Sequence, residues 1–207
     1  MSSVESDDGA RRAGAGEESA FLALVERYHG TLSRVAALWI EDPAQVEPLI
    51  EKTWRSMLYR LDRFDAQHSL KGWLCSVLIA FVLESVGPER AELKAAELEC
   101  EQAAVPAERF RPAGDRWEGH WSQPPTNWPQ VRAGGDVHAL MQRIIDTLPH
   151  AQRVVLVLRD VEQLTAPELE SALGLPEDVQ RKLLHQARSR VRGALEQHHE
   201  QRKRSST

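Results

Sequence analysis

Side chains suited to reading a nucleic acid gather near the C-terminal end of the chain, between apolar residues that recur every three or four positions from Val179 to Leu195. That spacing predicts a helix with one buried side. The polar residues on its other faces are Gln180, Arg181, Lys182, His185, Arg188, Ser189 and Arg192. In the major groove, Arg and Lys pair with guanine edges, Gln reads adenine, and further cations contact phosphate. These seven residues are the candidate DNA-binding set.

The segment before this helix favours a helix-turn-helix over an ordinary helical hairpin with a solvated, charged face. The Thr-Ala-Pro-Glu sequence at 165–168 has the spacing of a capping box and predicts a short helix. The Gly-Leu-Pro sequence at 174–176 predicts a tight turn before the next helix. Glu177 and Asp178 suit the positive end of that helix but would repel phosphate, so base contacts are expected one turn later.

Catalytic and metal-binding chemistry is not predicted. The sequence has no Gly-rich phosphate loop, and no nucleophile, base or carboxylate pair stands on a recognisable motif. His198 and His199 stand beside Glu200 in a basic tail, where solvated side chains are the favoured interpretation. His120 lies between two tryptophans without further ligands at zinc spacing. We therefore expect no enzyme, no catalytic residue, no metal site and no cofactor.

The charge of the chain is unevenly distributed along its 207 residues, although its net value is only −5. Residues 1–105 contain 11 Lys and Arg against 18 Asp and Glu, whereas residues 180–204 contain 8 against 2. This asymmetry favours an anionic partner for the C-terminal end. The polar, acidic N-terminus lacks the features of a signal peptide, and no run of eighteen apolar residues occurs, so a cytoplasmic protein without membrane insertion is expected.

Apolar periodicity predicts an all-α fold of two small helical domains, joined by a Pro/Trp-rich linker. Three amphipathic helices, the third capped by Ser69, are expected in the first domain, and four helices including the helix-turn-helix in the second. Cys75 falls inside an apolar helix, where it is expected to behave as a small hydrophobe. The expected divisions are a disordered tail at 1–17, the first domain at 18–88, a linker at 89–135, the second domain at 136–198 and a basic tail at 199–207.

The linker combines two kinds of sequence. Residues 89–104 have a helix-favouring composition with little apolar surface, whereas the following segment to residue 135 is dense in Pro, Gly and Trp. Trp117, Trp121 and Trp128 lie in this second part, although exposed indoles are uncommon in passive spacers. Two interpretations remain open: the tryptophans fix the linker to a neighbouring domain, or they bind a partner.

These features together resemble the small RNA polymerase sigma factors of the sigma-70 family, of the extracytoplasmic-function type, with divergence in the N-terminal domain. LPHAQRVVLVLRDVEQLTAPELESALGLPEDVQRKLLHQARSRVRGAL is similar to the family's region 4, whose helix-turn-helix recognises the upstream promoter element. FLALVERYHGTLSRVAALWI, VEPLIEKTWRSMLYRLDRFD and SLKGWL are similar to region 2, which binds core polymerase and melts the promoter. The RF…W…HWSQPP…W run resembles a Trp/Pro-rich linker of one branch.

The resemblance implies a sigma factor that binds core RNA polymerase and promoter DNA, and directs transcription initiation. The residues it assigns to core-polymerase binding are Glu47, Leu49, Ile50, Thr53 and Trp54. The residues it assigns to promoter melting are Arg60, Arg63, Lys71 and Trp73. The resemblance also implies a possible anti-sigma factor as a further partner.

Two alternatives stay open beside the sigma factor. No cation stands between Lys71 and Arg90, where the family usually has a basic helix for melted DNA, so the apolar helix here neutralises no phosphates. A degenerate sigma-like regulator that binds DNA without melting promoters alone fits that departure. A helical adaptor that binds an anti-sigma-type partner fits the apolar third helix and the Trp-rich linker. Transcription with purified core polymerase discriminates among the three.

Overall fold

The computed structural model describes residues 3–60, 69–87, 105–112, 114–123 and 137–205. Helices form the regular secondary structure of these ranges, which confirms the all-α prediction, and an isolated bridge pairs Phe110 with Trp121. The chain divides into two compact units. Unit 1 comprises residues 1–92 and 157–177, and unit 2 comprises residues 93–156 and 178–207.

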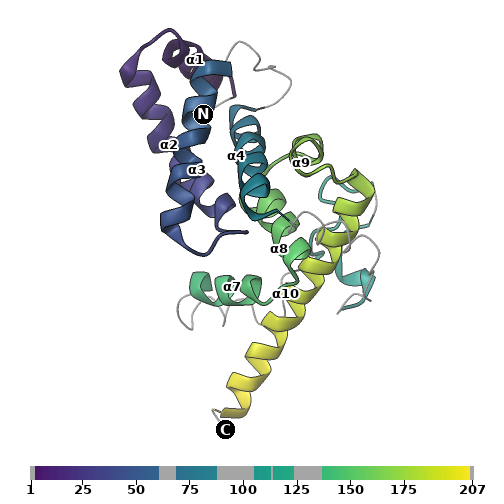
Figure 1. Cartoon of the computed structure of the whole chain (residues 1–207). Helices are drawn as coiled ribbons and strands as arrows, with labels where there is room; N and C mark the ends of the chain where they lie inside the picture. Colours follow the sequence, from purple (N-terminus) through teal and green to yellow (C-terminus); the bar gives the residue numbers. More distant parts are fainter. Residues whose placement is uncertain (1–2, 61–68, 88–104, 113, 124–136, 206–207) are drawn as a thin grey trace. The chain divides into compact units, whose positions relative to one another are not determined.

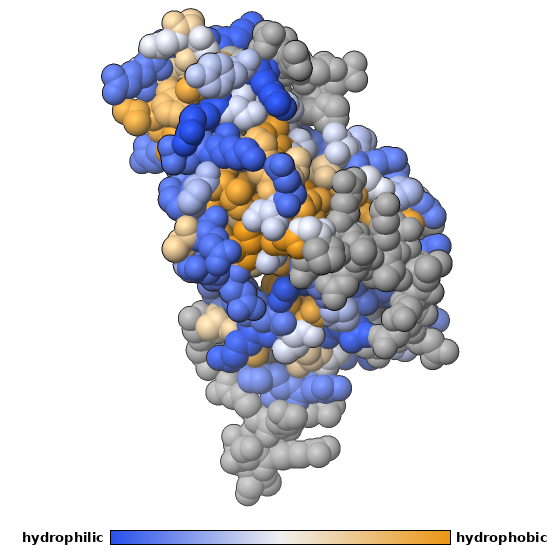
Figure 2. Space-filling model, in the orientation of Figure 1, coloured by the Kyte–Doolittle hydropathy of each residue, from blue (hydrophilic) through white to orange (hydrophobic). Residues whose placement is uncertain are grey.

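Unit 1 is built on four helices from the N-terminal half of the chain (Figure 1). They are α1 (Ser3–Gly14), α2 (Glu18–Ala36), α3 (Pro43–Arg60) and α4 (Leu70–Val86). The predicted apolar stripes of α2, α3 and α4 form its core, which includes Leu32, Met57 and Leu78. Hydrophilic side chains cover much of the visible surface of α2 and α3 in Figure 2, with apolar side chains between them. The helix ends follow local rules: Ser69 Oγ accepts a hydrogen bond from Gly72 N and caps α4.

Helix α1 corrects the prediction of a disordered tail at 1–17. Its Ala10 and Ala13 are buried, and the helix packs on α2. Arg12 donates hydrogen bonds to the Glu17 carboxylate, and these bonds and that of Ser19 lower the pKa of Glu17 to about 2. Small alanines supply the buried side of this helix, so the apolar periodicity that marks a larger amphipathic helix was missing.

The rest of unit 1 comes from the middle of the C-terminal half. A π-helical turn, η3 (Val157–Val161), and the short helix α9 (Ala166–Leu173) belong here, and α9 packs against α4. The capping box is confirmed, because Thr165 Oγ1 accepts a hydrogen bond from Glu168 N while the Glu168 carboxylate accepts one from Thr165 N. Gly174 ends α9 in the left-handed conformation, with φ of 67°.

One carboxylate holds the start of α9 to the start of α4. Glu168 Oε1 accepts hydrogen bonds from Ser69 N at 2.9 Å and Ser69 Oγ at 2.5 Å. Its other oxygen, Oε2, accepts from Thr165 N at 2.8 Å and Thr165 Oγ1 at 2.9 Å. Burial raises the pKa of Glu168, but these hydrogen bonds outweigh that effect and lower the pKa below its ordinary value. Glu168 therefore serves two helix ends at once.

A second carboxylate fixes η3 to the same region of unit 1. Glu162 is buried, with 3% of its side chain exposed, and its Oε1 accepts a hydrogen bond from Arg34 Nε at 2.7 Å. The backbone carbonyl of Glu162 accepts from Lys71 Nζ. Buried ions of this kind are tolerated when charge partners and hydrogen bonds satisfy them. Cys75 lies nearby in the core, and burial raises the pKa of its thiol to about 12.

Gly72 lies so close to Glu168 that a side chain is expected to be harmful there. A Cβ atom at Gly72 would lie 2.2 Å from Glu168 Oε1, an atom fixed by its hydrogen bonds. We expect Gly72→Ala to lower the free energy of unfolding by about 1–3 kcal/mol, the usual cost of forced overpacking. Urea unfolding followed by circular dichroism measures it.

Gly30→Ala in α2 is the matched control for Gly72→Ala. A Cβ there meets only Arg34 Nη1, at an ordinary 3.5 Å. Helix propensity alone then predicts a gain of about 0.5–1 kcal/mol. Equal effects of the two substitutions would contradict the close approach of Glu168 to α4.

Unit 2 contains η2 (Ala107–Arg109), α7 (Val137–Asp146), α8 (His150–Leu156) and all but the first residue of the long helix α10 (Glu177–Ser205). Leu140, Val154 and Leu195 are among its buried apolar residues, and Gln152 Nε2 donates a buried hydrogen bond to Gln186 Oε1 at 3.1 Å. Helix α10 continues to Ser205, through most of the basic tail expected at 199–207.

The compact units do not follow the domain division expected from sequence. Residues 157–177, expected in the second domain, group with the N-terminal helices, and the described part of the linker at 105–123 groups with α10. The two helices of the predicted helix-turn-helix, α9 and α10, thus fall in different units. Contacts between segments distant in sequence, such as Glu168 with Ser69, decide this grouping, and periodicity carries no signal for them. The helix predicted at 89–104 lies outside the described residues.

Candidate nucleic-acid interface

Helix α10 is amphipathic. Its apolar side belongs to the core of unit 2, and its polar residues lie on the other faces. Leu183, Ala187, Val191 and Leu195 are buried at the predicted three- and four-residue spacing. Glu177 and Asp178 are exposed in the first turn. The predicted amphipathic pattern of the helix is therefore present from its second turn onward.

The seven residues of the candidate DNA-binding set fall into three groups by exposure. Arg181 and Lys182 are exposed, with 61% of the Arg181 side chain accessible. His185 is half-buried. The buried members are Gln180, Arg188, Ser189 and Arg192. Whether any of them contacts DNA stays a prediction, but only the first group lies open at the surface.

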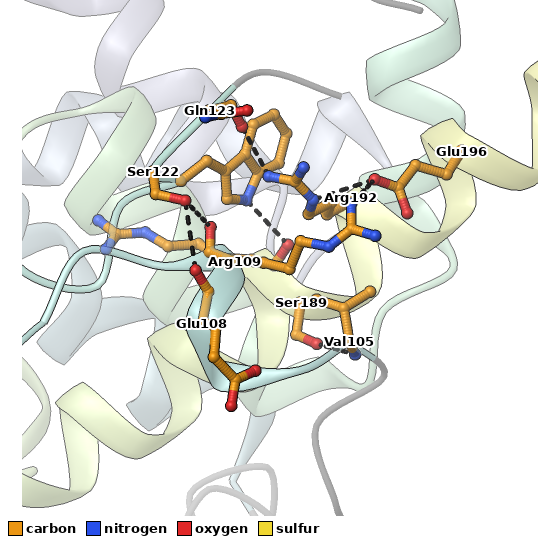
Figure 3. Close-up of polar contacts among 10 residues, drawn as sticks. Val105, Glu108, Arg109, Ser122, Gln123, Ser189, Arg192 and Glu196 are labelled. Atoms are coloured by element: carbon orange, nitrogen blue, oxygen red, sulfur yellow. Dashed lines mark hydrogen bonds and ion pairs between the residues drawn. The ribbon is translucent and has the colours of Figure 1, made fainter. Parts of the chain in front are cut away.

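The Pro/Trp-rich segment 105–123 buries part of this set, through hydrogen bonds to side chains and backbone of α10 (Figure 3). Val105 N donates to Ser189 Oγ at 2.8 Å, and the Trp121 indole Nε1 donates to the Arg188 carbonyl at 3.3 Å. The Arg192 guanidinium donates to the Gln123 carbonyl at 2.7 Å. Both ends of the described segment are therefore bonded to the same stretch of helix.

Glu196 balances the buried charge of Arg192. Arg192 Nε donates to Glu196 Oε1 at 3.1 Å, and the same oxygen accepts from Arg109 Nη1 at 3.0 Å (Figure 3). The Arg192 guanidinium also lies 5.7 Å from the ring centroid of Trp121, within cation–π range. With 2% of its side chain exposed, Arg192 is satisfied by the chain itself and is not presented to solvent.

The middle of the segment packs on two other members of the set. The Phe110 ring lies edge-on to His185, with centroids 4.5 Å apart, and Phe110 is itself buried. His120 Nε2 lies 3.3 Å from an Arg188 guanidinium nitrogen, and a Cβ at Gly119 would lie 3.2 Å from another. Burial, and then the charge of Arg188, lower the pKa of His185.

Acidification is expected to loosen this packing through His185. Its pKa in the folded chain is lowered, so the stabilisation by the neutral ring is complete above the ordinary pKa of about 6.5 and is lost as the pH falls below it. The charged neighbour is Arg188, which opposes a second positive charge beside it. We expect the wild type to lose more stability than His185→Gln between pH 7.5 and pH 5.5.

Urea unfolding at the two pH values measures that difference, and His138→Gln, on α7, serves as the matched control. Other titrating groups contribute equally to all three proteins and cancel in the comparison. A wild-type loss equal to that of His185→Gln would contradict the half-buried, neutral state of the His185 ring.

The residues assigned to core-polymerase binding lie along α3 in unit 1. Ile50, Thr53 and Trp54 are buried, and Thr53 Oγ1 donates to the Leu49 carbonyl at 2.8 Å. Leu49 is half-buried, and Glu47 is exposed near His29, with 3.8 Å between His29 Nε2 and the carboxylate. Sequence reasoning missed a further feature of this helix: Leu58 and Tyr59 are exposed apolar residues at its C-terminal end, and Tyr59 is 85% exposed.

The residues assigned to promoter melting have different surroundings. Arg60 is exposed at the end of α3, and Arg63 lies outside the described residues. Lys71 donates to the Glu162 carbonyl, and Trp73 is half-buried on α4. The role of these residues in melting stays a prediction.

The described ranges contain neither a cluster of possible metal ligands nor a membrane-spanning helix. No three His, Cys, Asp or Glu residues there lie close enough together to hold a metal ion. Of the helices that the structure describes, none combines the length and apolar character needed to cross a bilayer.

Comparison with protein families finds a match in the C-terminal half of the chain. Residues 138–191 match the family model described as Sigma-70, region 4. The match confirms the resemblance to region 4 of the sigma-70 family and spans α7, α8, α9 and most of the polar face of α10. The extracytoplasmic-function type and the N-terminal resemblance stay predictions. A comparison with curated proteins finds no match.

Proposed function

We propose that the chain is a sigma factor that binds core RNA polymerase and directs transcription initiation by recognising promoter DNA through α10. The observation that carries the proposal is the region 4 match at 138–191, which contains the capping box, the left-handed Gly174 and the first half of the basic helix α10. Exposed Arg181 and Lys182 lie one turn into α10, past the acidic first turn, where base and phosphate contacts were expected.

In this proposal the N-terminal helices supply the polymerase contacts. Glu47 and Leu49 offer accessible surface on α3, while buried Ile50, Thr53 and Trp54 hold that helix in the core of unit 1. The chain acts as a subunit of RNA polymerase in the cytoplasm, and it catalyses no reaction itself. The promoter specificity then belongs to the second half of the chain, and the polymerase contact to the first.

A second candidate function is a sigma-like regulator that binds DNA or polymerase without opening promoters alone. The observation that favours it is the state of the region 2-like helix: α4 is apolar, and the one cation in its sequence, Lys71, is bonded to the Glu162 carbonyl. Melted DNA needs cations along its path, since counterion release supplies most of the affinity for phosphate. This candidate keeps α10 as the DNA-binding element.

Transcription in vitro with purified core RNA polymerase and a library of genomic fragments tests the proposal. Transcripts that depend on the added chain support the sigma factor. DNA or polymerase binding without transcripts supports the regulator. Binding to neither would refute both, and would leave a helical adaptor for a protein partner such as an anti-sigma factor. A chain with Glu47→Lys serves to show whether transcripts require the exposed side of α3.

A further inference from the structure

Segment 105–123 occupies the part of α10 that a DNA duplex would need. Its hydrogen bonds end on Ser189 Oγ, the Arg188 carbonyl and the Arg192 guanidinium (Figure 3). A recognition helix works only if its base-facing side chains enter the major groove, which is about 12 Å wide and has no room for a second layer of chain. DNA cannot contact Ser189 or Arg192 while the segment is in place.

The segment is held mainly by interactions that can be exchanged. Phe110 is its one residue in the described ranges that is buried as a large hydrophobe, whereas Arg109, Arg111 and Trp117 are exposed. The remaining attachment consists of hydrogen bonds, the ion pairs Arg109–Glu196 and Glu118–Arg181, and the contact of the Trp121 ring with Arg192. Each contributes about 3 kcal/mol at most. Such a layer is far easier to remove than a layer of core side chains.

The segment also engages the cations that would otherwise meet phosphate. Arg192 is saturated by Gln123 and Glu196, and Glu118 Oε1 lies 4.0 Å from Arg181 Nε. Gly119, with φ of 70°, brings the backbone against Arg188, where a Cβ would be crowded. The segment therefore contacts the basic helix at Arg181, Arg188 and Arg192, along three successive turns.

We propose that residues 105–123 are an internal cover over the DNA-binding face of α10, and that the cover must leave before DNA binds. The inference rests on the proposed function, because it takes α10 as the DNA-binding helix. For one of the linker tryptophans it favours the first of the two interpretations: the Trp121 indole fixes the segment to its own unit. The apparent association constant for DNA is then the intrinsic association constant multiplied by the fraction of molecules in which the helix is uncovered.

The test changes the cover and leaves α10 intact. Phe110→Ala with Trp121→Ala removes the buried ring and the indole hydrogen bond. Arg109→Ala breaks the ion pair to Glu196 with little risk to folding. Trp117→Ala is the matched control, since this exposed indole contacts Arg116 and His120 of the segment itself. Binding to a random duplex DNA library is measured by fluorescence anisotropy at 50 mM salt, and circular dichroism checks folding.

The cover predicts at least tenfold tighter DNA binding by Phe110→Ala/Trp121→Ala, a smaller increase by Arg109→Ala, and no change by Trp117→Ala. The Arg109 variant is diagnostic, because losing a cation by itself weakens binding to DNA. Trypsin should cleave after Arg109 or Arg116 faster when DNA is bound, since the segment is then displaced.

Two other outcomes separate the cover from the proposed function. Equal, tight binding by the wild type and the variants, lost on Arg181→Ala/Lys182→Ala, would overturn the cover and leave α10 as the DNA-binding helix. Failure of every variant to bind DNA, although trypsin shows the segment released, would overturn the proposed DNA recognition and the cover with it.

Discussion

Replacing both Arg181 and Lys182 with alanine is expected to weaken DNA binding by roughly tenfold to a hundredfold, about 1–3 kcal/mol, and to make the salt dependence shallower by about two units of slope. These two side chains are the exposed cations of the candidate set, one turn beyond the acidic start of α10. The measurement is duplex affinity between 50 and 200 mM salt, in the Phe110→Ala/Trp121→Ala background, where α10 is uncovered.

Arg116→Ala/Arg143→Ala is the control for that pair of substitutions. It removes two exposed cations from unit 2 without touching α10, so the change in net charge is the same. A general electrostatic attraction would respond equally to both double variants. If the two affinities and the two salt slopes agree, the assignment of DNA binding to α10 is wrong.

Replacing Glu168 with alanine is expected to lower the free energy of unfolding by about 3–4 kcal/mol. The carboxylate accepts four hydrogen bonds, from the backbone and hydroxyl of Ser69 and of Thr165, and so completes the caps of α4 and α9. Loss of one cap costs about 0.5–2 kcal/mol, and buried donors left without an acceptor add about 1–3 kcal/mol. Urea unfolding of unit 1, followed by helix circular dichroism, measures the change.

Glu170→Ala on the same helix is the control, since that exposed side chain carries the same charge. It is expected to change stability by less than about 0.5 kcal/mol. Glu168→Gln adds a pH test. Because the folded pKa of Glu168 is lowered, the advantage of the wild type over this variant should be full above pH ~4.5 and shrink as the pH falls further. An advantage that does not depend on pH would contradict the charged, hydrogen-bonded state.

The local features of the fold could be predicted because single side chains encode them. Ser69, Thr165 and Gly174 each set a helix end through their own hydrogen bonds or conformational freedom, and all three behave as expected. The apolar stripes of α2, α3 and α4 could also be predicted, because the spacing of apolar residues within one segment encodes them. Helix α1 was missed because its buried residues in the described part, Ala10 and Ala13, are alanines, which carry little hydrophobic signal.

The arrangement of the candidate site could not be predicted, because it depends on partners distant in sequence. The pattern marks Arg188, Ser189 and Arg192 as a polar face, but it does not reveal that residues 105–123 bury them. In the same way, a capping box identifies Glu168 with Thr165 and gives no hint of its bonds to Ser69. The one available signal was the density of tryptophan in a segment without periodicity.

Directed DNA cleavage from α10 tests the central claim that this helix contacts promoter DNA. An iron chelate attached at Lys182→Cys, in a Cys100→Ser background, is assembled with core RNA polymerase and promoter fragments taken from the transcription library. Cys75 stays unlabelled, because it is buried and its thiol pKa is raised to about 12. If α10 contacts promoter DNA, the strands are cleaved within a window of about one helical turn, upstream of the start site. Absence of cleavage, or a pattern matched by a chelate at Arg143→Cys, would contradict this contact.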